Sequence, residues 1–273
     1  MSLRALFTII LLFAGVYLAF HVITSRNEQE EASAHTTPLS TALGKEVPLI
    51  TISHTTKDEP ATLTVLNYDT PKILIYSDPV AADRANAYIA RFIDDAIGRF
   101  RSESKRGNTN ASTTIGTLNT FTLSSKVLLA TPRIISIAVT ESTMLAQIPH
   151  PEQYVRYITF DLMQAKALEA KDLFAGNDAM MNTALLLSKQ ENAKGLSSAA
   201  INQALLRDDQ HALSRDGLLV SVDKDPDPNT ATRSSIEFIL PYNAIERYIS
   251  KDIKEAVRTE QENIRMAEPE PQQ

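Results

Sequence analysis

Hydrophobic positions are spread unevenly along the chain, and the longest apolar run lies at the amino terminus. Residues 5–24 carry no formally charged side chain at neutral pH. A helix of this length spans about 30 Å, the thickness of the hydrocarbon core of a bilayer. An unbroken apolar run also offers no polar face to water. The pattern predicts one N-terminal transmembrane helix at residues 5–24, after a short cytoplasmic head at residues 1–4.

A buried core helix and a cleaved signal peptide are the alternatives for this run. Its apolar positions show no helical periodicity, which disfavours a core helix. A signal peptide has a shorter apolar region, followed promptly by a small-x-small cleavage site. Here the nearest such site, residues 32–34, lies beyond the charged residues 26–31. We therefore expect an uncleaved anchor that binds the membrane.

The charges on either side of the span give its orientation. Arg4 and the terminal amine precede the run, whereas Arg26 is followed closely by acidic residues. This bias slightly favours an amino terminus inside the cell. We expect a single-pass protein of the cell membrane, with its C-terminal domain outside the cytoplasm.

The rest of the chain divides by composition. Residues 25–45 are polar and rich in Ser, Thr, Glu and Ala, which predicts a flexible stalk. The folded domain is expected at residues 46–266, and the Glu/Pro/Gln-rich residues 267–273 are expected to be a disordered tail.

Within the folded domain, apolar positions either alternate or recur every three to four residues, which predicts strands and helices respectively. The clearest helix is expected at residues 81–101, with a polar loop at 102–114. A helical stretch interrupted near Gly195 is expected at 179–206, and a last helix is expected to begin near Tyr242. Strands are predicted at 49–53, 61–68, 72–76, 117–129, 134–141, 154–162, 217–222 and 235–240.

The spacing of these elements predicts the fold class. Strands close in sequence pair antiparallel, because parallel pairs need a long crossover connection. Helices that are segregated from runs of strands are typical of an α+β domain. We therefore expect an α+β fold, with an antiparallel sheet packed with a few helices.

The composition of the chain disfavours or excludes several kinds of partner and functional site. The net charge of −6 disfavours nucleic acid as a partner, since phosphates are neutralised by excess Lys and Arg. The absence of cysteine excludes disulfides, zinc–thiolate sites, iron–sulfur clusters and thiol nucleophiles. The glycines form no G-x-G-x-x-G loop, and no Gly-x-Ser-x-Gly elbow surrounds Ser142. We expect no cofactor, no metal ion and no enzymatic activity.

Four short phrases occur in the order and spacing of a known family. They resemble the RsiV-like extracytoplasmic domain, described as domain of unknown function 3298, which is also found in PdaC-type deacetylases. The resemblance covers about residues 70–253. The phrases are Ile135-Ser136-Ile137, Phe160-Asp161-Leu162 with Lys171-Asp172-Leu173-Phe174, Asp216-Gly217-Leu218, and Phe238-Ile239-Leu240-Pro241-Tyr242.

The phrases have a structural interpretation, with Asp216-Gly217 expected in a tight turn that needs positive φ. The chain also departs from the family pattern. Residues 145–150 replace a Gly-Gly-Ala-His turn and keep only the histidine, His150, and residues 223–234 replace an aromatic-rich segment. Binding and specificity residues are commonly carried by such loops, so the family's ligands do not transfer directly to this chain.

The resemblance implies a recognition function, since RsiV members sense lysozyme through this domain. The short head is expected to hold no anti-sigma segment. We expect a membrane-anchored extracytoplasmic binding module of the bacterial cell envelope, which recognises cell-wall polysaccharide such as peptidoglycan, or a lysozyme-like protein. The candidate ligand-binding residues are Glu141, His150 and Asp161; the alternative for His150 is a surface histidine in a rigid Pro-His-Pro turn.

Two other functions stay open. In an uncharacterised envelope glycan hydrolase, Glu141, His150 and Asp161 would converge in one cleft, because glycoside hydrolysis needs two facing carboxylates. In a structural subunit of a membrane complex, the last helix would expose an apolar stripe for another protein. That stripe would comprise Ile245, Ile249 and Ile253.

Overall fold

The computed structural model describes residues 47–108, 118–146, 152–224 and 234–258, all of which lie within one compact unit, His35–Gln273. The expected cytoplasmic head, anchor, stalk and tail fall outside the described residues. Among the helices that are described, none combines the length and apolar character needed to cross a bilayer.

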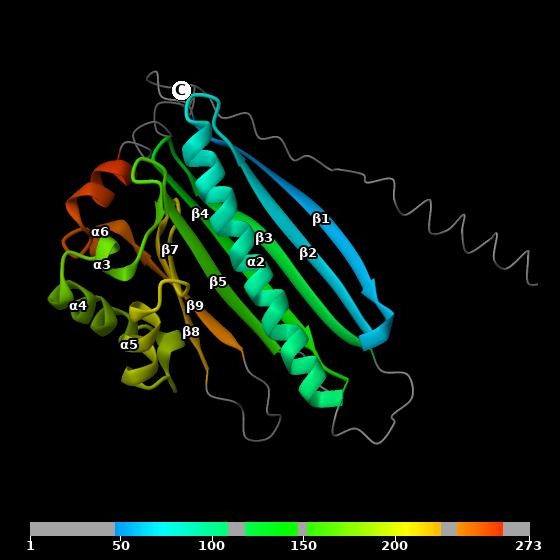
Figure 1. Cartoon of the computed structure of the whole chain (residues 1–273). Coiled ribbons are helices and arrows are strands. Elements are labelled where there is room, and N and C mark those ends of the chain that lie inside the picture. The colour runs from blue at the N-terminus through cyan, green and yellow to red at the C-terminus, as the bar shows by residue number, and fades with distance from the viewer. Residues whose placement is uncertain (1–46, 109–117, 147–151, 225–233, 259–273) are drawn as a thin grey trace, which may run out of the picture. The chain divides into compact units, whose positions relative to one another are not determined.

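The larger sheet contains six strands in chain order (Figure 1). Neighbouring strands are antiparallel except β2 and β3, which are parallel. The expectation of a wholly antiparallel sheet is therefore wrong. Helix α2 (Pro79–Asn108) joins these two strands and supplies the crossover that a parallel pair needs. The strands are β1 (Leu49–Glu59), β2 (Thr64–Leu74), β3 (Asn119–Ala130), β4 (Ile134–Met144), β5 (Glu152–Asp161) and β6 (Lys166–Ala167).

Several boundaries differ from the predictions, and the largest changes include those at β1, which extends to Glu59, at β2 and at α2. The two strands predicted between residues 61 and 76 form the single strand β2, which follows the short helix η1 (Pro60–Thr62). Helix α2 extends to Asn108, so the first half of the predicted loop at 102–114 is helical. Ser104 is buried four residues after Phe100. The buried side of the helix thus continues through Ser104, and a search for apolar positions does not detect this polar residue.

The predicted apolar stripe of α2 is confirmed. It packs on one face of the larger sheet and forms a core with side chains of β2, β3, β4 and β5. The rings of Phe100 and Phe121 have centroids 5.2 Å apart. The helix residues in this core are Ala82, Ala85, Ile89, Ile93, Ala96, Ile97 and Phe100.

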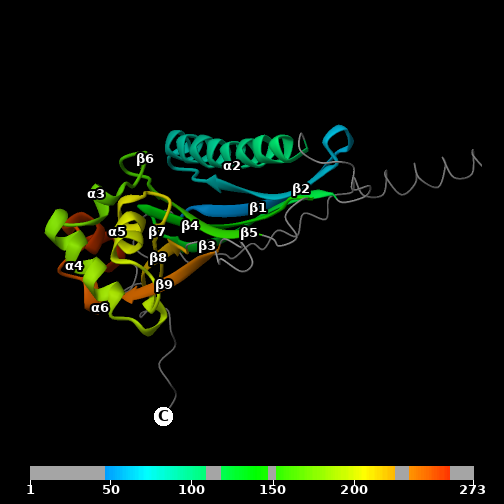
Figure 2. The same cartoon turned by 90° about the horizontal axis from the view of Figure 1, so that it is seen from below.

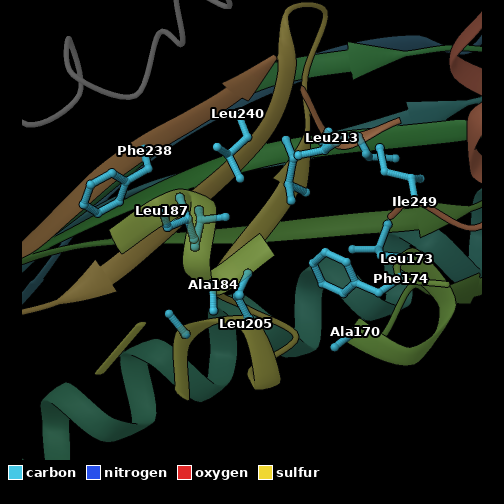
Figure 3. Close-up of a cluster of buried hydrophobic side chains, with 14 of the residues drawn as sticks. Ala170, Leu173, Phe174, Ala184, Leu187, Leu205, Leu213, Phe238, Leu240 and Ile249 are labelled. Carbon is cyan, nitrogen blue, oxygen red and sulfur yellow. The ribbon is translucent and has the colours of Figure 1, made fainter. Parts of the chain in front are cut away.

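A second, antiparallel sheet of three strands lies on the face opposite α2 (Figure 2). Tyr157 and Ala138 of the larger sheet pack against Ala212 of the smaller sheet. A further core joins the small sheet to the short helices, as Figure 3 shows. These elements are α3 (Ala170–Leu173), α4 (Asn177–Ser188), η2 (Glu191–Ala193), α5 (Ser198–Leu206), β7 (His211–Leu213), β8 (Gly217–Asp223), β9 (Ser235–Pro241) and α6 (Tyr242–Ile245).

The last predicted helix is interrupted. Helix α6 ends at Ile245, and helical structure resumes at residues 251–258. Between them, Ile249 forms a β-bridge with Phe174, and the backbone N–H of Ser250 donates to the Leu173 carbonyl at 2.8 Å. These bonds to the α3 segment replace the bonds of a continuous helix.

Gly217 has a different role from the one predicted. It begins β8 opposite Pro241, and it is not among the glycines with positive φ. A Cβ atom at this position would lie 2.1 Å from the carbonyl oxygen of Leu240. Glycine is therefore required here by the close approach of β9, and not by a left-handed turn.

Candidate functional site

Glu141 is a carboxylate held in a largely apolar strand. Its position in β4 places it on the face covered by α2, and it is 8% exposed. One ion pair reaches it, from Arg99 Nη2 of α2 to Oε2 at 3.3 Å. Burial raises the pKa of Glu141, and the positive charge of Arg99 opposes this rise only in part.

Aromatic and charged side chains of β5 lie beside Glu141, and one of them connects the site to β8. Tyr154 is its direct partner in the register of β4 and β5. The guanidinium of Arg156 lies over the Tyr154 ring, 5.0 Å from the centroid. Arg156 also donates from Nη1 and Nη2 to the two carboxylate oxygens of Asp223, at 2.8 and 2.9 Å. We call Arg99, Glu141, Tyr154, Arg156 and Asp223 the Glu141 site.

An ion-pair network continues from this site along the edge of β5. Arg207 donates to both carboxylate oxygens of Asp209, at 3.0 and 2.9 Å. Asp209 Oδ2 lies 3.5 Å from Arg156 Nε, and its backbone carbonyl accepts from the Tyr157 N–H at 2.8 Å. The network attaches the segment before β7 to the edge of β5. It thereby fixes Arg156 in the Glu141 site.

Asp161 lies at the other end of the strand pair. It is fully buried and pairs in register with Ile134, whereas Glu141 lies seven residues further along β4. At about 3.3 Å per residue this separation is about 23 Å. Arg133 Nε and Nη2 donate to Asp161 Oδ2 at 3.1 and 3.0 Å, and the Gln164 N–H donates to Oδ1 at 3.0 Å. The structure therefore does not bring Glu141 and Asp161 together.

The third candidate, His150, lies outside the described residues. The described ranges contain no cluster of three or more His, Asp or Glu residues suited to a metal ion. Arg156 was missed by sequence reasoning, and Asp223 was not among the candidate ligand-binding residues. A signal existed for the first, since Arg156 is a charged residue inside the apolar strand sequence YVRYITF.

His211 is another buried titratable group, on a different element. It is fully buried in β7, and neither ring nitrogen has a hydrogen-bond partner. The ring packs edge-on against Phe174, with centroids 6.0 Å apart. Desolvation lowers the pKa of His211 below its usual value. The folded protein thus carries this histidine uncharged.

This burial predicts a loss of stability in acid. Below about pH 6.5 the unfolded chain protonates His211 while the folded chain resists protonation, so the free energy of unfolding falls as pH drops. One such group contributes a slope of at most about 1.4 kcal/mol per pH unit. Denaturant titrations between about pH 5 and 8 should show that the free energy of unfolding of His211→Leu depends less steeply on pH than that of the wild type. An unchanged pH dependence in the His211 variant would refute the prediction.

Together, the two stacked sheets with α2 on one face define an α+β domain that carries the mixed-charge Glu141 site. Its fold is similar to the crystal structure of a DUF3298 family member from Bacteroides fragilis, with a TM-score of 0.53 and 14% identity over 79% of this chain and 98% of that chain. A DUF3298 family protein from Pseudomonas aeruginosa matches with a TM-score of 0.43, 14% identity and the same two coverages.

No protein-family model matches the chain, and no curated protein matches it either. The likeness to the Bacteroides fragilis structure therefore concerns the fold. At that level it confirms the resemblance to domain of unknown function 3298 that the four sequence phrases indicated.

Proposed function

We propose that the chain is a membrane-anchored binding module of the bacterial cell envelope, which recognises cell-wall polysaccharide through its folded domain. The DUF3298-like fold and the RsiV-like phrases support the class of module. The apolar run at residues 5–24 supports the anchor and the placement of the domain outside the cytoplasm. Protease added to intact spheroplasts tests this placement, and protection of the domain would contradict it.

The Glu141 site is the observation that carries the ligand class. A sugar hydroxyl can donate to a carboxylate and accept from a guanidinium, and the apolar face of a sugar ring can pack on a tyrosine. The site places these three kinds of group on adjacent strands and α2. Its two arginines are matched by two carboxylates, which favours a ligand of low charge over a nucleic acid.

The proposal includes no catalytic step. A glycoside hydrolase would need a second carboxylate facing Glu141, and Asp161 is about 23 Å away along the strands. The structural-subunit hypothesis is also weakened, because Ile245, Ile249 and Ile253 are 0%, 6% and 2% exposed and belong to the core. That part of the chain therefore presents no apolar stripe to another protein.

Glu141→Gln is expected to weaken binding of soluble peptidoglycan fragments by the full-length chain about tenfold or more. The substitution keeps the shape of the side chain and removes the charge, and hydrogen bonds to charged groups contribute about 1.5–3 kcal/mol. Fluorescence anisotropy measures the effect. Glu191→Gln makes the same change at a highly exposed position and should bind as the wild type does. Equal affinities for the two variants would count against the Glu141 site.

A further inference from the structure

The face of the larger sheet opposite α2 is only partly covered by the smaller sheet. At one end, Ala138 and Tyr157 pack against Ala212, and that region is apolar. Towards the other end, the side chains on this face become polar and exposed, as Thr122 and Ser124 show. Figure 2 shows α2 and the small sheet on opposite sides of the larger sheet.

Strand register aligns five polar side chains in one row across this face. Thr56 pairs with Asn67, Asn67 with Thr122, Thr122 with Ser142, and Ser142 with Gln153. We call these five residues the polar row. Adjacent strands are about 4.8 Å apart, so the row is about 19 Å long.

Alternation along each strand places the row on the side away from α2. Leu66, Phe121 and Glu141 precede row residues in β2, β3 and β4, and all three face α2. Their successors Asn67, Thr122 and Ser142 therefore face the other way. Thr56, Thr122 and Gln153 are exposed, and Asn67 and Ser142 are half-buried.

The row consists of uncharged hydroxyl and amide groups. Thr56 Oγ1 donates to Asn67 Oδ1 at 2.9 Å, which orients the first pair. Hydroxyls and amides can both donate and accept hydrogen bonds, as the hydroxyl and acetamido groups of a glycan do. The flanking pair Ser124 and Thr140 extends the hydroxyl surface by one further position.

We propose that the polar row binds a neutral glycan chain laid across the strands. This inference rests on the proposed function and assigns it a second contact surface. A nucleic acid or an acidic peptide would need cationic side chains, and the row has none. An apolar protein surface would need apolar partners, which the row also lacks. Glu141 and Ser142 are consecutive, so the two surfaces lie back to back at the same end of the sheet.

A β-1,4-linked N-acetylglucosamine hexamer, which is neutral, serves as the probe for the full-length chain. Thr56→Val/Thr122→Val keeps side-chain volume and strand preference while it removes two hydroxyls, and we expect about tenfold weaker binding. Gln153→Ala tests the far end of the row and should weaken binding about threefold. Thr55→Val is the matched control: it lies in the same strand on the opposite face and should bind as the wild type does.

The outcomes separate the two proposals. Suppose that the wild-type chain binds peptidoglycan and that Glu141→Gln binds it more weakly. If both row variants then bind the hexamer with wild-type affinity, the polar row is overturned and the proposed function stands. Failure of the wild-type chain to bind either the hexamer or peptidoglycan would overturn both. Equal losses in the row variants and in Thr55→Val would also overturn the row, because the effect would then not depend on the face.

Discussion

Asp161→Ala is expected to lower the free energy of unfolding by about 3–5 kcal/mol, the usual range when one partner of a buried ion pair is removed. Arg133 would keep its charge at a side chain only 20% exposed and would lose both of its bonds to Asp161. The N–H of Gln164 would lose its acceptor as well. Denaturant unfolding followed by circular dichroism measures the change.

Asp95→Ala provides the control for this loss. Asp95 also forms an ion pair, with Arg91 at 3.9 Å, but the two side chains are 64% and 84% exposed. Exposed pairs of this kind contribute about 0–1 kcal/mol. If Asp161→Ala were as mild as Asp95→Ala, the buried pair would not have the structural role assigned to it.

Gly217→Ala is expected to destabilise the protein by about 1–3 kcal/mol or more. The added Cβ would meet the Leu240 carbonyl at 2.1 Å, and backbone atoms of β9 cannot move aside as a side chain can. The pairing of β8 with β9 would then have to shift. Thermal and denaturant unfolding should both show the loss.

Gly98→Ala, the same substitution in α2, should have the opposite effect. A Cβ at Gly98 has no atom within 4 Å to meet, and alanine is favoured over glycine in a helix interior by about 0.5–1 kcal/mol. A stable Gly217→Ala protein would show that β8 and β9 do not approach as closely as the 2.1 Å contact implies.

The contrast between Gly98 and Gly217 shows which structural constraints can be predicted from the sequence. Asp216-Gly217 is a typical turn pair, and local patterns assign its glycine to positive φ. The actual constraint comes from Leu240, more than twenty residues away, and no local pattern contains it. Local periodicity did predict the buried stripe of α2, because its residues recur at intervals of three and four, apart from the adjacent pair Ala96 and Ile97.

The larger errors in the sequence-based predictions also come from contacts between residues that lie far apart in the chain. The parallel pairing of β2 with β3 depends on where the chain returns after α2. The other strands are close in sequence, and their short spacing led to the expectation that every pair is antiparallel. Glu141 was a candidate as one of two carboxylates, but its neighbours Arg99 and Arg156 come from α2 and β5. Asp223, from β8, completes the site only through tertiary packing.

Sedimentation of the full-length chain with purified, insoluble peptidoglycan would decide whether this protein recognises the cell wall. The chain should enter the pellet in a saturable manner, and soluble N-acetylglucosamine oligomers should compete it off. Immobilised lysozyme should capture none of it. A chain that stays in the supernatant, or that binds lysozyme and not peptidoglycan, would contradict polysaccharide recognition.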